Sequence, residues 1–199
     1  MKINDDTNLV LPVRFDDKGV AVYGYHTPIS REVFEANYRI LSATKSTLGS
    51  KGVYFQMDAG PRIAALTLKD EGTKDSESRG EFDAHGSPLD GGAGALLKEI
   101  KRLTTILVPG ASGWDMVPVD AAISSGSIDE DDWREVESAI VFFTCHYALA
   151  KKADRQRLSG ATASLLRGSI TSLPLTEYLA SLPSLTKAEP SRAGSSVPS

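Results

Sequence analysis

The sequence predicts an α+β protein that is mostly helical, with an N-terminal β-hairpin, a helical bundle and a flexible C-terminal tail. Two β-prone runs flank a turn near the start, and several later segments repeat apolar residues at the spacing of one helix face. The last part of the chain is rich in Ser, Leu, Thr and Ala. Composition divides the chain into an N-terminal part at 1–68, a polar loop or linker at 69–92, a helical part at 93–158 and a flexible tail at 159–199.

The composition limits the classes of function that this protein can have. The chain has 199 residues of which 41% are hydrophobic, enough for a real core. A net charge of −4 without a basic stripe argues against binding to nucleic acid, which depends on neutralising phosphates. No apolar run approaches the roughly 20 residues of a membrane-spanning helix, and the first residues lack the apolar region of a secretion signal. The single Cys145 excludes an internal disulfide, so we expect a cytoplasmic protein without nucleic-acid or membrane partners.

The N-terminal hairpin is predicted from residues 9–15 and 19–25, which are β-prone and are joined by Asp and Gly residues suited to a tight turn. Pro12 lacks a backbone donor, so its strand is expected at a sheet edge.

Three shorter helices are expected next. Thr27 and Pro28 resemble an N-cap and first helical position, and Gly49 is the expected stop of that helix. Its apolar stripe consists of Phe34, Tyr38, Leu41 and Leu48. Further helices are expected at 60–68 and 94–103. The residues Trp114, Met116, Val117 and Val119 form an apolar patch that we expect under a loop.

Residues 127–157 are predicted to form one long amphipathic helix. Ser127 and Glu130 fit the S-x-x-E capping box. An apolar face recurs at helical spacing through Trp133, Val136, Ile140, Phe143 and Tyr147. Acidic residues crowd the start, and the basic cluster at the end, which complements the helix dipole, consists of Lys151, Lys152, Arg155 and Arg157. These cations either cap the helix or contact an acidic partner.

A short amphipathic helix is expected at 173–182, followed by a disordered tail at 188–199. Its apolar residues fall at i, i+3, i+4 and i+7 and are Leu175, Tyr178, Leu179 and Leu182. This spacing suits a helix laid into another protein's groove. It equally suits a final helix folded back on its own core, so both interpretations stay open.

No catalytic or cofactor motif stands out. Cys145 and His146 are adjacent on a helix and point about 100° apart, so they form no dyad. His26 and His85 lie outside any metal-ligand spacing, and the glycines at 91–94 match neither a P-loop nor a dinucleotide fingerprint. We therefore expect no metal and no cofactor, and a binding or scaffolding protein. A small enzyme using Cys145 or His85 is the least favoured alternative.

Several segments together resemble the tail assembly chaperones of long-tailed bacteriophages. They are residues 25–34 (YHTPISREVF), 60–66 (GPRIAAL), 97–103 (LKEIKRL), 113–118 (GWDMVP) and 176–179 (TEYL).

The resemblance implies a non-enzymatic, self-associating protein of the infected host's cytoplasm. Such a protein binds the tape-measure protein and keeps it soluble while tail-tube subunits assemble, and it is absent from the mature virion. The sequence predicts the partner-binding residues at the basic cluster and at the stripe of 173–182. The alternative is a structural tail-completion or connector protein of the virion.

Overall fold

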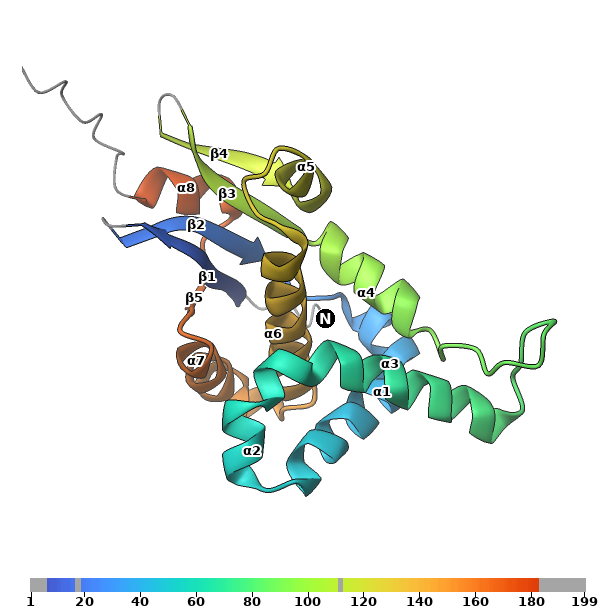
Figure 1. The fold of residues 1–199 in the computed structure, drawn as a ribbon. Coiled ribbons are helices and arrows are strands. Elements are labelled where there is room, and N and C mark those ends of the chain that lie inside the picture. Colours follow the sequence, from blue (N-terminus) through green and yellow to red (C-terminus); the bar gives the residue numbers. More distant parts are fainter. Residues whose placement is uncertain (1–6, 17–18, 111–112, 183–199) are drawn as a thin grey trace, which may run out of the picture.

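The computed structural model describes residues 7–16, 19–110 and 113–182, of which 59% lie in helices and 20% in strands, so the protein is mixed α/β (Figure 1). The elements are β1 (Asn8–Asp16), β2 (Gly19–His26), α1 (Arg31–Ser50), α2 (Val53–Asp58), α3 (Gly60–Arg79), α4 (Ala93–Arg102), β3 (Thr104–Gly110), β4 (Gly113–Pro118), α5 (Val119–Ser124), α6 (Glu130–Ala148), the 3-10 turn η1 (Lys152–Asp154), α7 (Arg155–Leu165), β5 (Ser169–Thr171) and α8 (Leu175–Ser181).

The five strands form one antiparallel sheet in the order β4-β3-β2-β1-β5. The predicted N-terminal hairpin is confirmed as β1 and β2. The prediction that Pro12 marks an edge strand is wrong for the start of β1, because β5 pairs there with Asn8, Leu9 and Val10. Pro12 itself lies beyond these pairs, next to a register shift, where a missing backbone donor breaks no pairing to β5.

Helices and strands share one core. Side chains alternate between the two faces of a strand, so Leu9 and Leu11 of β1 face the helices while Val10 faces the other side. The central helix is α6, which contacts α1, α3, α4 and α7 and contributes the three largest fully buried side chains, Tyr147, Phe142 and Phe143. Figure 1 shows α6 against the sheet, with α8 apart from the other helices.

The start of α1 differs from the prediction. Its N-cap is Ser30, whose hydroxyl accepts the Val33 backbone N–H at 3.2 Å, and not Thr27. The helix also continues past Gly49 to Ser50. Tyr38, predicted on the buried stripe, is 54% exposed, and Ile40 is buried instead.

The predicted polar linker at 69–92 is wrong in its first half. Residues 69–79 continue α3, so the helix crosses the predicted boundary at residue 68. Ion pairs within the helix, Lys74 to Asp70 at 2.6 Å and Arg79 to Asp75 at 3.0 Å, suit its polar sequence. The helix ends at Gly80, whose φ of +70° lies in the left-handed region.

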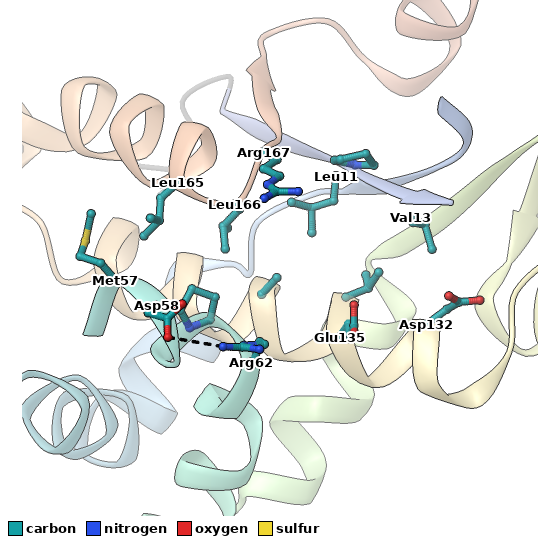
Figure 2. A pocket seen from close by; sticks show the side chains of 14 residues that line it. Leu11, Val13, Met57, Asp58, Arg62, Asp132, Glu135, Leu165, Leu166 and Arg167 are labelled. Carbon is teal, nitrogen blue, oxygen red and sulfur yellow. Dashed lines mark ion pairs between the residues drawn. The ribbon is translucent and has the colours of Figure 1, made fainter. Parts of the chain in front are cut away.

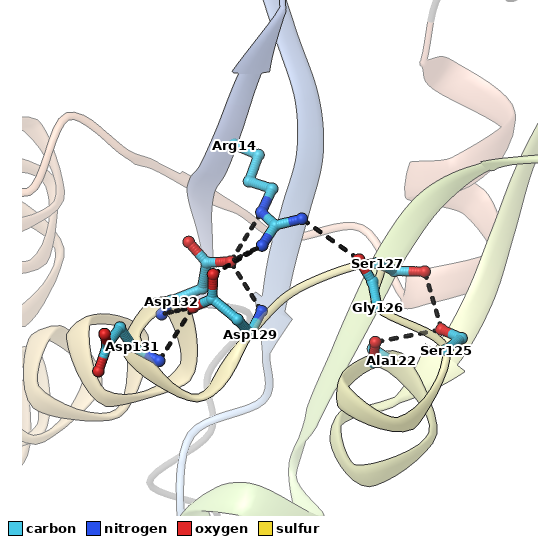
Figure 3. A network of polar contacts seen from close by, with 8 residues as sticks. All are labelled: Arg14, Ala122, Ser125, Gly126, Ser127, Asp129, Asp131 and Asp132. Atoms are coloured by element: carbon cyan, nitrogen blue, oxygen red, sulfur yellow. Dashed lines mark hydrogen bonds and ion pairs between the residues drawn. The ribbon is translucent and has the colours of Figure 1, made fainter.

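The predicted long helix at 127–157 is shorter at both ends. The capping box consists of Asp129 and Asp132, and not of Ser127 and Glu130 (Figure 3). The helix ends at Ala148, and the basic cluster predicted at its end lies in the loop, η1 and α7.

A second hairpin, β3 and β4, was not predicted. Residues 114–117, expected under a loop, form the body of the edge strand β4, in which Met116 is 49% exposed. Within the described residues no helix is both long and apolar enough to cross a membrane.

Candidate binding surfaces

The apolar stripe of α8 covers the second face of its own sheet. Leu175, Tyr178, Leu179 and Leu182 are half-buried and pack against a small cluster formed by Val10, Tyr25 and Leu107. The rings of Tyr25 and Tyr178 lie 5.7 Å apart, and the Tyr25 hydroxyl donates to the Leu173 carbonyl at 2.8 Å. Burial and the neighbouring Tyr178 raise the pKa of Tyr25 to about 12. Of the two interpretations of this segment, folding back onto the chain's own core is what the structure contains.

The prediction of a flexible tail at 159–199 is therefore wrong for residues 159–182. Most of α7 lies in this region and buries Ser159, Thr162 and Ala163, and β5 and α8 follow it. The tail predicted at 188–199 lies outside the described residues.

The basic cluster lies after the end of α6, spread over the loop, η1 and α7. Lys151 and Lys152 are exposed, and Arg157 lies 3.5 Å from Asp154. Lys152 and Arg155 line a cavity of about 470 Å³, called here the basic cavity, whose other lining residues are Thr7, Tyr147, Gln156, Ile170, Thr171 and Ser172.

A larger hollow, the α2–α6 cleft, has a volume of about 530 Å³ (Figure 2). Residues from β1, α2, α3, α6 and the α7–β5 turn line it. Its apolar lining consists of Leu11, Pro12, Val13, Met57, Pro61, Val136, Ala139, Leu165 and Leu166, and its charged residues are Asp58, Arg62, Asp132, Glu135 and Arg167. The cleft thus combines an apolar floor with charged groups of both signs.

Some of these charged side chains form ion pairs and others do not. Arg62 lies 3.5 Å from Asp58, and Asp132 binds Arg14. Glu135 and Arg167 make no ion pair within the described part of the chain. Arg167 is also the one described non-glycine residue with positive φ, at +55°, a conformation that costs energy for a residue with a Cβ.

Helix α2 borders this cleft and turns apolar side chains toward solvent. None of its residues is buried: Val53 is 75% exposed, Tyr54 85% and Met57 49%. Large exposed apolar groups that are contiguous mark interaction surfaces more often than isolated ones do.

A hydrogen bond anchors α2 to α6. The Phe142 carbonyl can only accept, so His146 Nδ1 donates to it at 2.8 Å, and His146 Nε2 accepts from Gln56 Nε2 at 3.0 Å. Burial lowers the pKa of His146, which favours this neutral form. Helix α2 is therefore held in place, although Val53, Tyr54 and Met57 have no partner surface among the described residues.

The candidate nucleophile Cys145 is fully buried in α6, and burial raises its pKa to about 12. Its thiol is therefore protonated at neutral pH, and a thiol is a weak nucleophile. His26 is buried beside Thr104, whereas His85 lies exposed in the loop after α3. No three of the described His, Cys, Asp and Glu residues gather as a metal site would require.

The fold and its surfaces define a mixed α/β protein with an open amphipathic cleft beside an exposed apolar helix. In comparisons with family models, curated proteins and solved structures, nothing matches this chain.

The α2–α6 cleft could not be predicted from the sequence, because its lining comes from five segments that are distant along the chain. The one local signal was the apolar run in α2, which starts at Val53 directly after Gly52.

Proposed function

We propose that this protein is a tail assembly chaperone of a long-tailed bacteriophage, acting by binding and not by catalysis. It binds the tape-measure protein in the host cytoplasm, keeps it soluble, helps to recruit tail-tube subunits and is absent from the mature virion. The resemblance of several sequence segments to these chaperones supports the choice of partner. The observation that supports a binding role is the exposed apolar face of α2 beside the α2–α6 cleft.

The cleft suits an amphipathic helix. Such a helix binds by placing apolar side chains, spaced three and four residues apart, into a groove. In the cleft the apolar floor would receive these side chains, while Met57 and Tyr54 would extend the contact along α2. Glu135 and Arg167, which lack ion pairs among the described residues, would meet opposite charges that flank the partner's apolar stripe.

This arrangement differs from the one that the sequence suggested. There the α8 stripe and the basic cluster were the predicted partner-binding residues, but the α8 stripe covers its own sheet. We accordingly assign tape-measure binding to the cleft and α2. A long helical partner can engage many copies of such a site, and self-association of the chaperone would add avidity without high single-site affinity.

The test uses the tagged full-length protein in infected or prophage-induced cells, with mass spectrometry of the proteins that co-purify. A long helical tape-measure protein should co-purify with the wild type. Met57→Glu should reduce its recovery, because a carboxylate at the apolar cleft must be desolvated on binding. Met116→Glu is the matched control, since Met116 has the same 49% exposure but lies on β4. Equal recovery with both variants would reject the cleft as the binding site.

Particles purified from the same infected or induced cells distinguish a chaperone from a structural virion component. Purified particles should contain tape-measure and tube proteins but not this chain. If the chain is found in the particles at stoichiometric amounts, it is a structural tail protein and the chaperone proposal is wrong.

A further inference from the structure

The basic cavity shares no lining residue with the α2–α6 cleft. None of its described lining residues carries a carboxylate. It contains two cationic side chains, Lys152 and Arg155, together with the amide of Gln156 and the hydroxyls of Thr171 and Ser172. Every one of these groups can donate a hydrogen bond. We infer that the cavity binds an oxyanion, either a carboxylate of an acidic peptide segment or a free phosphate.

The two cations are uncompensated within the described residues. Neither Lys152 nor Arg155 makes an ion pair there, while the neighbouring Asp154 lies 3.5 Å from Arg157. Two uncompensated cations in one concave site create a positive potential that attracts anions. This local charge contrasts with the net charge of −4 of the whole chain.

Two of the donors, Arg155 and Thr171, are also held in position. Arg155 Nε donates to the Ala150 carbonyl at 3.3 Å, a bond that orients the guanidinium and leaves its terminal nitrogens for a ligand. The Leu173 backbone N–H donates to Thr171 Oγ1 at 3.1 Å, so this hydroxyl can turn its own proton toward the cavity. Such charge-assisted hydrogen bonds from pre-positioned donors are about twice as strong as neutral ones.

The volume of about 470 Å³ fits an oxyanion carried on a larger group better than a small ion alone. The inference does not depend on the tape-measure proposal, because the two surfaces share no lining residue.

Isothermal titration calorimetry of the full chain at low ionic strength tests the inference, with inorganic phosphate in one arm and a blocked peptide of glutamates in the other. We expect at least one probe to bind. The double variant Lys152→Gln and Arg155→Gln should weaken that binding about tenfold or more, because it removes both positive charges and the charge-assisted hydrogen bonds that they donate. Binding of the peptide alone identifies carboxylate as the ligand, and binding of phosphate alone identifies phosphate.

The matched control is the double variant Lys98→Gln and Arg134→Gln, which removes the same charge at exposed positions outside both surfaces. It should leave the affinity unchanged. Asp5 and Asp6 directly precede Thr7, which lines the cavity, and their carboxylates are oxyanions of the chain itself. Both probes are therefore also titrated into a chain with Asp5→Asn and Asp6→Asn, in which these carboxylates cannot compete with the probe. Absence of binding in both backgrounds, or an equal loss in the control variant, overturns the inference.

Discussion

Arg14 on β1 and Asp132 in the first turn of α6 meet through a single carboxylate oxygen. Arg14 Nε donates to Asp132 Oδ2 at 2.7 Å, and this same oxygen accepts the Asp129 backbone N–H at 2.9 Å (Figure 3). A second carboxylate, that of Asp129, lies 3.0 Å from Arg14 Nη2. One guanidinium thus binds both members of the capping box and fixes the start of α6 against the sheet.

Replacing Arg14 with Gln should lower the free energy of unfolding by about 1 kcal/mol, because the Asp132 side chain is only 21% exposed and loses a charged donor. Arg134→Gln is the control, since the pair of Arg134 with Asp131 is 73% and 85% exposed and should contribute less than about 0.5 kcal/mol. Urea unfolding measures both. Equal decreases in the free energy of unfolding would show that the contact of Arg14 with Asp132 stabilises the protein no more than an exposed ion pair does.

Two helical glycines should respond oppositely to alanine. In Gly72→Ala of α3 the new Cβ would lie 2.1 Å from the Asp90 carbonyl oxygen, so the loop must shift, at a cost of about 1–3 kcal/mol. A Cβ at Gly49 of α1 meets nothing within 4 Å, and Gly49→Ala should stabilise by up to about 1 kcal/mol. Thermal melts of the two variants test this contrast. A stabilised Gly72→Ala would mean that α3 and the loop do not pack as described.

Stability should fall as the pH drops below about 6.5, and His26 should contribute. Burial lowers the pKa of His26 to about 3, so between these values the unfolded chain binds a proton that the folded chain does not. The resulting loss is about 2 kcal/mol at pH 5 and is absent above pH 7.

His26→Asn keeps a donor toward Thr104 and should flatten the dependence of unfolding free energy on pH between 7 and 5. The exposed His85→Asn is the control and should leave that slope as in the wild type. If the His26 variant loses stability in parallel with the wild type, the imidazole is not buried in its neutral form.

Helix α8 should detach without unfolding the rest, because its side chains belong to the small second cluster and none of them is fully buried. The double change Leu175→Ala and Leu179→Ala should raise the binding of a hydrophobic dye and speed amide exchange over α8, while exchange in α6 stays slow. Leu66→Ala, at a 66% exposed site on α3, should do neither. Loss of protection throughout the chain would instead show that α8 is part of the main cooperative unit.

The sequence by itself predicted the elements whose pattern is local. The hairpin β1–β2, helix α4 and the apolar face of α6 follow from turn residues and side-chain periodicity. Trp133, Val136 and Ile140 are indeed all buried, because a residue's place on a helix face depends only on its position in the repeat.

Elements that depend on distant partners were misjudged. Strand β3 follows α4 directly and pairs with β2, far back in the chain, as well as with β4, which follows it. Gly110 and Gly113 flank the short connection between β3 and β4, so the β3–β4 hairpin had a local turn signal, whereas the pairing of β3 with β2 had none. Residues 69–79 look like a linker because they are polar, yet they form a helix that α1 contacts, with Arg39 binding Asp75 at 2.7 Å. Local composition does not report such contacts.

The candidate sites show the same division. Residue types alone identified the basic cluster and the stripe of α8, but a stripe at helical spacing fits a partner's groove and the chain's own sheet equally well. Only the tertiary structure decided between them, because the second face of the sheet offers Val10, Tyr25 and Leu107 for burial next to α8. It also formed the α2–α6 cleft, since lining residues from five segments come together only when the sheet and helices have packed around one core.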